Sequence, residues 1–136
     1  MNLSVLLLGL EAIIAYLFVL GAHSLRHRFG QGYFYALLGG MTAVMAWVTD
    51  AGFLIEVSGI TFVVGSTVFY TALLLGVFVI YVFDGPGAAR IGISTVLFVS
   101  ILTPLTAALI HFHANLAGFD LAWVPRPSLR ITLASA

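Results

Sequence analysis

Residues 59–90 decide the fold of this chain, and they read GITFVVGSTVFYTALLLGVFVIYVFDGPGAAR. The stretch opens with a short β-favouring piece at 60–64 and continues with the hinge Gly65-Ser66-Thr67. An apolar run over about 67–83 follows. This run approaches the roughly 20 residues that a helix needs to cross a bilayer. The turn at 84–87, Asp-Gly-Pro-Gly, then ends the helix, because glycine tolerates positive φ and proline lacks an N–H donor. The stretch therefore predicts one membrane-spanning helix against which the other apolar segments pack.

The composition is that of an integral membrane protein. Of the 136 residues, 62% are hydrophobic and only 7% are charged, whereas a soluble domain carries about 25% charged residues. The formal net charge is zero and no basic run is present, which argues against a nucleic-acid partner. The chain has no cysteine, so disulfides and cysteine-ligated metals are excluded.

The apolar segments predict an all-α, polytopic transmembrane helix bundle that forms a single domain over residues 1–136. We expect four full spans and the start of a fifth, at about 2–22, 33–49, 67–83, 91–112 and 128–136. The last of these, which contains RITLASA, looks like the opening of a helix that the sequence does not complete. The chain is therefore expected to be a fragment of a larger bundle.

The segment between the first two spans indicates the orientation. Residues 23–32, HSLRHRFGQG, are predicted to form a polar loop, and Arg26 and Arg28 make it the most basic loop in the chain. The positive-inside rule places this loop in the cytoplasm, so the N-terminus would lie outside the cytoplasmic (inner) membrane. We interpret His23 and His27 as loop residues, because no third metal ligand lies near them in the sequence.

Six polar residues within or near the predicted spans are candidates for binding a ligand. Glu11 lies at the centre of the first span, where a carboxyl group is costly unless it faces protein or water. The other five fall on the outer side in this topology and could line an outward-facing mouth. The candidates are Glu11, Asp50, Glu56, Tyr70, His111 and His113.

Each candidate also has a purely structural interpretation. Acids at the end of a span are usually solvated, Glu11 could be a protonated packing residue, and Tyr70 could belong to an interfacial aromatic belt. The two histidines, His111 and His113, point to different faces of a helix, which disfavours a shared metal site. A haem or metal would need an axial partner that the sequence does not provide, so no cofactor and no metal are expected.

Three motifs resemble those of a known family. ITFVVGSTVFY at 60–70 precedes the central span, DGPGAAR at 84–90 follows it, and RITLASA at 130–136 comes later. Their order and spacing, from about residue 55 to the end, are similar to the VUT family of vitamin-uptake and queuosine-precursor transporters. The resemblance implies that residues 33–49 correspond to the family's first helix and that residues 2–22 are an additional span.

One departure from the family pattern concerns the central span. Transporters of the VUT family usually carry a polar, acidic Thr-Asp pair there, often followed by a charged residue, whereas this chain has Gly76 and Val77, and later Tyr81. A transporter of a polar heterocycle needs hydrogen-bonding groups in its pocket. VUT-like bundles without these groups resemble the sensory input modules that precede histidine-kinase or diguanylate-cyclase domains.

The leading hypothesis is therefore a membrane sensor module that binds a small apolar or aromatic ligand. Two alternatives remain: a transporter or transporter subunit for a queuosine-precursor-like or vitamin-like molecule, and a structural accessory subunit. An enzyme is not expected, because the sequence contains no Ser-His-acid arrangement, metal cluster or phosphate loop. The expected partners are the lipid bilayer and, in a homodimer or larger membrane assembly, other helices.

Overall fold

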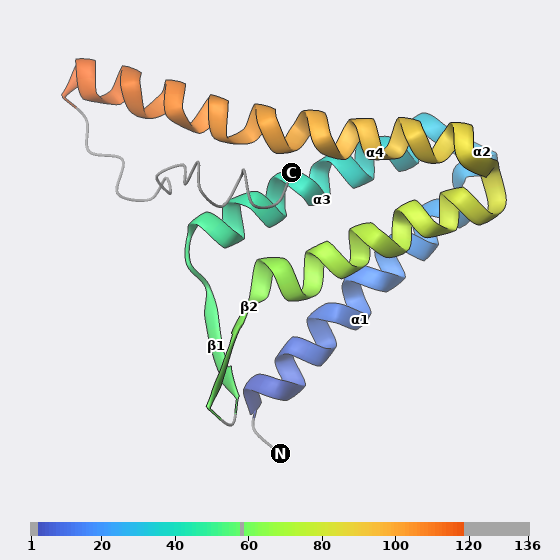
Figure 1. Ribbon diagram of the computed structural model, residues 1–136, viewed down its shortest axis with the longest axis horizontal. Coiled ribbons are helices and arrows are strands. Elements are labelled where there is room, and N and C mark those ends of the chain that lie inside the picture. Colours follow the sequence, from blue (N-terminus) through green and yellow to red (C-terminus); the bar gives the residue numbers. More distant parts are fainter. Residues whose placement is uncertain (1–2, 58, 119–136) are drawn as a thin grey trace.

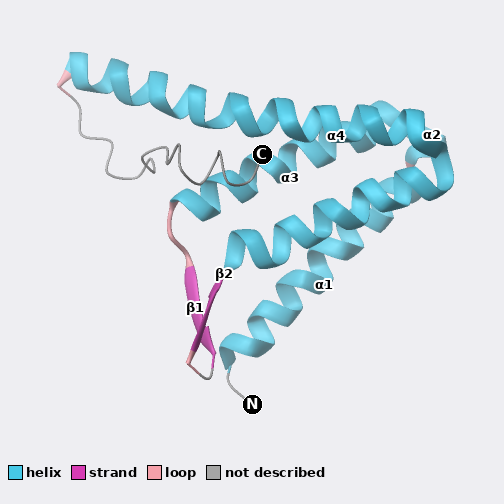
Figure 2. Cartoon of the chain, in the orientation of Figure 1, coloured by secondary structure: helices cyan, strands magenta, loops and turns pink. Residues whose placement is uncertain are grey.

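The computed structural model describes residues 3–57 and 59–118, which form a mostly helical structure. Its elements follow one another from a long first helix to a very long last helix (Figures 1 and 2). In chain order they are α1 (Leu3–Ser24), α2 (Arg26–Phe29), α3 (Gln31–Asp50), β1 (Leu54–Val57), β2 (Ile60–Val63), the π-helical turn η1 (Gly65–Phe69) and α4 (Tyr70–Ala117). The predicted start of a fifth span, 128–136, lies outside the described residues.

Three helices are long and apolar enough to cross a membrane, in place of the four full spans that were predicted. Their apolar parts are Val5–Ser24, Gln31–Asp50 and Thr67–Ala117. The first two agree with the predicted spans to within three residues. The predicted third and fourth spans both lie within Thr67–Ala117, the end of η1 and the whole of α4. Helix α4 continues through its two prolines, Pro86 and Pro104.

Helix α4 nevertheless has two arms, because its backbone leaves the helical conformation at one residue. Gly85 has φ 87° and ψ 176°, a conformation that is open almost exclusively to glycine. Figure 1 shows the chain reversing its direction there, so that the second arm, 86–117, returns across the molecule. The predicted turn at 84–87 is thus confirmed as a change of direction, although it does not end the assigned helix.

The segment before α4 folds as a short antiparallel hairpin. Leu54 pairs with Val63 and Val57 pairs with Ile60, and Gly59 takes a positive φ of 80° in the turn between the strands. The β-favouring residues at 60–64 therefore form a strand, as predicted. The three residues predicted as a hinge, Gly65-Ser66-Thr67, lie in the π-helical turn that joins the hairpin to α4.

The core lies between α1, α3 and the first arm of α4. Its largest fully buried side chains are Phe34, Leu38, Ile80, Val19, Val68 and Thr42. Thr42 is the polar member of this set, and its hydroxyl donates a hydrogen bond to the Leu38 carbonyl oxygen at 2.8 Å. The buried hydroxyl is therefore satisfied within its own helix, which avoids the cost of an unpaired polar group.

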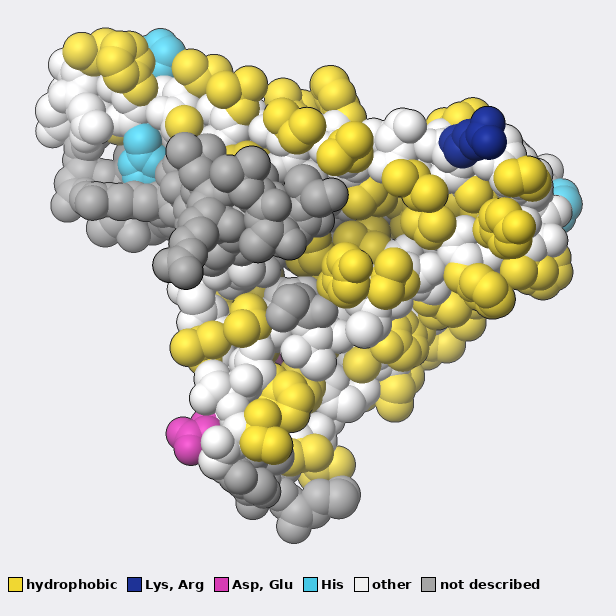
Figure 3. Space-filling view, viewed as in Figure 1, with side chains coloured by type: hydrophobic (Ala, Val, Ile, Leu, Met, Phe, Trp, Pro, Cys, Tyr) yellow, Lys and Arg dark blue, Asp and Glu magenta, His cyan; other side chains and the backbone are white. Residues whose placement is uncertain are grey.

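Most of the large apolar side chains point outward. Phe18, Phe78 and Phe98 are more than 60% exposed, and Figure 3 shows hydrophobic side chains over most of the visible surface of the helices. Such a continuous apolar surface is unfavourable in water and suits the hydrocarbon of a bilayer. The structure thus describes a membrane protein with several apolar helices.

Candidate functional site

Three charged or titratable side chains meet where α1, α2 and the break in α4 come together. His23 lies in the last turn of α1, Arg26 begins α2, and Asp84 directly precedes the Gly85 break. The Asp84 carboxylate contacts both partners, with Oδ2 3.1 Å from His23 Nε2 and Oδ1 3.2 Å from Arg26 Nε. We call these residues the His23–Arg26–Asp84 cluster.

Arg26 also contacts the histidine ring, so each member of the cluster touches the other two. Its Nη1 lies 2.7 Å from Nδ1 of His23 and also approaches Nε2. The Arg26 guanidinium, which can only donate, contacts both nitrogens of the ring, and the Asp84 carboxylate contacts Nε2. His23 lies on α1 and Arg26 on the short helix α2 that follows it, whereas Asp84 is 61 residues beyond His23 in the sequence.

The cluster is partly withdrawn from solvent. The side chains of His23, Arg26 and Asp84 are only 9%, 13% and 11% exposed. Phe34 presents its ring at 73° to that of His23, with centroids 5.3 Å apart, and the Arg26 guanidinium lies 5.8 Å from the Phe83 ring centroid. A charged group in such surroundings is tolerated when it is paired and hydrogen-bonded, which these contacts provide.

A further contact ties α3 to the second arm of α4 beside the cluster. The Tyr35 hydroxyl donates a hydrogen bond to the Ala88 carbonyl oxygen at 3.2 Å. Ala88 lies three residues beyond the Gly85 break, so the end of the first arm and the start of the second arm are each held by polar contacts. The cluster and the Tyr35 hydrogen bond together hold the change of direction of α4 against α1, α2 and α3.

These groups form a set of polar contacts between α1, α2 and α4. The Asp84 carboxylate is engaged by both neighbours through its two oxygens. Within residues 3–57 and 59–118, no group of three or more histidines, cysteines and acids is arranged to hold a metal. We assign the cluster a positioning role at the joint of α4.

The structure distributes the six sequence-predicted candidates over four elements. Glu11 is exposed on α1, Asp50 is the partly buried last residue of α3, and Glu56 is exposed on β1, paired with Thr61. In α4, Tyr70 is the first residue, and His111 and His113 lie near the far end of the second arm. Figure 1 shows this far end and the β1–β2 hairpin in separate parts of the molecule.

Two of these candidates have local features that bear on the structural interpretation. Tyr70 is 48% exposed, as an interfacial aromatic residue would be. His113 donates from Nδ1 to the Leu109 carbonyl oxygen at 2.8 Å, one turn back in its own helix.

Sequence reasoning missed the cluster, because His23 was interpreted as a loop residue and Asp84 as part of a helix stop. Residues 23–32 in fact contain the end of α1 and the short helix α2. One signal was present in the sequence: both charged turns fall on the same side of the membrane in the predicted topology. An acid and a base that share the edge of a bilayer are expected to pair.

The centre of the core contains a second informative position, Gly76. A Cβ atom there would lie 2.6 Å from Leu38 Cδ2, 3.4 Å from Val19 Cγ1 and 3.7 Å from Phe34 Cζ. The site is therefore closed by aliphatic and aromatic packing and has no room for a side chain. At the position where the VUT resemblance leads us to expect a polar residue, three helices meet in apolar contact.

The fold and the cluster define a helical membrane protein of several apolar helices, held together by a polar joint at one end. A comparison with protein families matches residues 16–124 to a family described as vitamin uptake-like sensor. This match covers about four fifths of the chain, and the chain belongs to that family. No curated protein and no solved structure matches the chain.

The family match confirms the resemblance inferred from the sequence motifs and extends it. The motifs indicated similarity from about residue 55, whereas the match begins at residue 16, within α1. The second half of α1 thus belongs to the family region, and it is this half that carries His23.

Proposed function

We propose that this chain is the ligand-sensing module of a membrane signalling protein. In this proposal a small apolar or aromatic molecule binds between the helices and changes how α1, α3 and α4 pack. The family to which the chain belongs supports a sensor. The observation that carries the choice of an apolar ligand is the closed packing of Leu38 onto Gly76.

The packing at Gly76 argues against transport of a polar molecule through the core. A polar heterocycle would need hydrogen-bond partners to replace the water it loses, and an unpaired polar group in an apolar site costs about 1–3 kcal/mol. Val19, Phe34 and Leu38 supply no such partners around Gly76. A ligand that shifts these side chains must do so by apolar contact and shape.

We further propose that the signal passes to a cytoplasmic output domain of the histidine-kinase or diguanylate-cyclase type. The basic residues of α2 support a cytoplasmic position for the joint and an outside N-terminus. Each arm of α4 would then cross the bilayer separately, which gives four crossings in this chain. The proposal assigns no catalytic reaction to the module itself.

A ligand screen on the whole chain in lipid nanodiscs tests the sensor proposal. We expect small aromatic compounds to raise the melting temperature, because a ligand at 100 times its dissociation constant stabilises the state it binds by about 2.7 kcal/mol. In parallel, proteoliposomes containing the chain should take up no more labelled deazapurine than empty vesicles. Uptake above that background, without stabilisation by any apolar compound, would replace the sensor by a transporter.

The orientation has a direct test, because the chain contains no cysteine. Single-cysteine variants at His27 on α2 and at Leu54 on β1 place one thiol at each end of α3, and both native side chains are exposed. In intact cells, a membrane-impermeant maleimide should label Leu54→Cys and should label His27→Cys only after lysis. The opposite pattern would reverse the proposed topology.

A further inference from the structure

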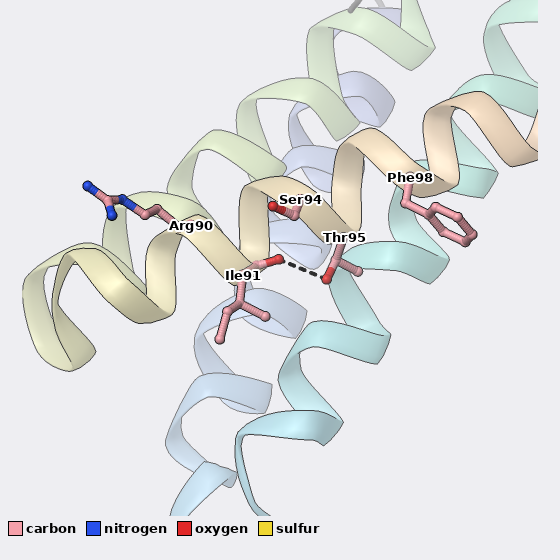
Figure 4. A pocket seen from close by; sticks show the side chains of 5 residues that line it. All are labelled: Arg90, Ile91, Ser94, Thr95 and Phe98. Atoms are coloured by element: carbon pink, nitrogen blue, oxygen red, sulfur yellow. Dashed lines mark hydrogen bonds between the residues drawn. The ribbon is translucent and has the colours of Figure 1, made fainter.

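A shallow groove runs along the second arm of α4, just beyond the Gly85 break (Figure 4). It has a volume of about 400 Å³. The residues that line it are Arg90, Ile91, Ser94, Thr95 and Phe98. We call it the Arg90 groove. It combines one cation, two hydroxyls and two apolar side chains on a single helical arm.

Two of the three polar groups of the groove, those of Arg90 and Ser94, are not used by the fold. Within the part of the chain that the structure describes, neither Arg90 nor Ser94 has a hydrogen-bond or ion-pair partner. Figure 4 shows the Arg90 side chain extended outward from its own helix. Thr95 differs, because its hydroxyl already donates to the Ile91 carbonyl oxygen at 2.9 Å. One guanidinium and one hydroxyl, four residues apart, are thus available to a ligand.

The excess of positive charge near the joint of α4 favours an anionic ligand. Asp84 is the acid at this joint, and it is engaged by His23 and Arg26. Arg28 on α2 and Arg90 on α4 remain without a carboxylate among the described residues. An arginine fork and a hydroxyl at the edge of a bilayer are complementary to a phosphate oxygen.

The apolar half of the groove indicates that the anion carries a hydrocarbon chain. Phe98 is 65% exposed and lies eight residues beyond Arg90, about 12 Å deeper along a helix. The polar end of the groove, at Arg90, is therefore followed along the arm by its apolar end, at Phe98. A phospholipid presents its phosphate and its acyl chain in the same order. A soluble phosphate would leave the apolar end unused.

We propose that the Arg90 groove binds one anionic phospholipid, with the phosphate on Arg90 and Ser94 and an acyl chain along Phe98. The proposal depends on the helices lying in a bilayer and is independent of the sensor function. The bound lipid would cover the outer side of α4 next to its joint. It would thereby couple the lipid composition of the membrane to the position of the second arm.

Native mass spectrometry on the intact chain tests this proposal. The chain is released from nanodiscs of phosphatidylcholine with a minor fraction of phosphatidylglycerol, and the retained lipids are counted. We expect one phosphatidylglycerol to be retained in preference to phosphatidylcholine. Arg90→Gln should weaken this retention about fivefold, the effect of one basic residue near an anionic surface. Ser94→Ala should weaken it about threefold, as expected for one lost hydrogen bond.

Two matched variants separate this site from general attraction and from misfolding. Arg28→Gln removes an exposed arginine from the same end of the molecule but outside the groove, and Thr95→Val removes a hydroxyl that is already bonded within the helix. Both should keep the retained lipid, and Arg90→Gln should keep the wild-type melting temperature in pure phosphatidylcholine. Equal losses in Arg28→Gln and Arg90→Gln would overturn the proposal.

Three other results would also overturn it. The first is the absence of any preference for phosphatidylglycerol. The second is that soluble glycerol phosphate competes as well as the lipid does, which would mean that the acyl chain is not recognised. The third is that a second copy of the chain occupies the groove in place of the lipid. The last would appear as a dimer that Arg90→Gln dissociates.

Discussion

Neutralising Asp84 should destabilise the joint of α4 more than neutralising any exposed acid. In Asp84→Asn the side chain keeps its size and one carbonyl oxygen, but His23 and Arg26 lose the charge that both contact, at 3.1 and 3.2 Å. Breaking a buried ion pair costs about 3–5 kcal/mol, and breaking an exposed pair costs at most about 1 kcal/mol.

The expected magnitude lies between these limits. The three side chains retain about a tenth of their exposure, and the asparagine oxygen can still accept one hydrogen bond from Arg26. We therefore expect a loss of about 2–3 kcal/mol in the free energy of unfolding. For a chain of this size, such a loss lowers the melting temperature by roughly 8–12 °C.

The assay is thermal unfolding of the whole chain in nanodiscs of one lipid composition. Glu56→Gln is the control, because it neutralises an exposed acid on β1, and it should leave the melting temperature unchanged. A double-mutant cycle with Arg26→Gln and Asp84→Asn should give a coupling energy above about 0.5 kcal/mol, as expected for residues in contact. The reasoning is refuted if Asp84→Asn behaves like Glu56→Gln, or if the two substitutions are additive.

Two further predictions concern glycines and use neighbouring glycines as controls. Gly85→Ala should lower the free energy of unfolding by about 1–3 kcal/mol, because a φ of 87° with ψ 176° is strained for any residue with a Cβ. Its control, Gly87→Ala, is in open helical surroundings and should be neutral or slightly stabilising. Equal melting temperatures of the two variants would contradict the assigned break. Gly76→Ala should lower stability by about 1–3 kcal/mol, since its Cβ would lie 2.6 Å from Leu38 Cδ2. Gly40→Ala, with nothing within 4 Å of its Cβ, should not, and a tolerated Gly76→Ala would show that the core at this point is loosely packed.

Local sequence patterns predicted the elements well. The β-branched and aromatic residues at 60–64 indicated a strand, and the Asp-Gly-Pro-Gly sequence at 84–87 indicated a reversal, because both depend on the backbone preferences of neighbouring residues. The number of separate helices was overestimated for a related reason. Pro86 fits the first turn after a break, where its missing N–H leaves no intrahelical hydrogen bond unmade, so the helix resumes at once.

Contacts between distant segments could not be predicted in the same way. Apolar periodicity indicates that a helix has a face but does not identify its partner, so the seating of Leu38 on Gly76 was not visible in the sequence. The pairing of His23 with Asp84 joins residues 61 positions apart. The candidates Glu11, Asp50 and Glu56 were chosen because they are charged, and charge by itself does not indicate which side chains converge.

The break at Gly85 gives the second arm of α4 the mechanics of a lever. Residues 86–117 extend for about 48 Å at a rise of 1.5 Å per residue. A rotation of about 5° around Gly85 would move the far end of the arm by roughly 4 Å, while atoms within about 10 Å of the pivot would move by less than about 1 Å. The contacts of Asp84 and the Tyr35 hydrogen bond, which lie beside Gly85, can therefore persist while the far end of the arm moves by about the width of a side chain. A displacement of the far end of the arm therefore corresponds to only a small change of angle at Gly85.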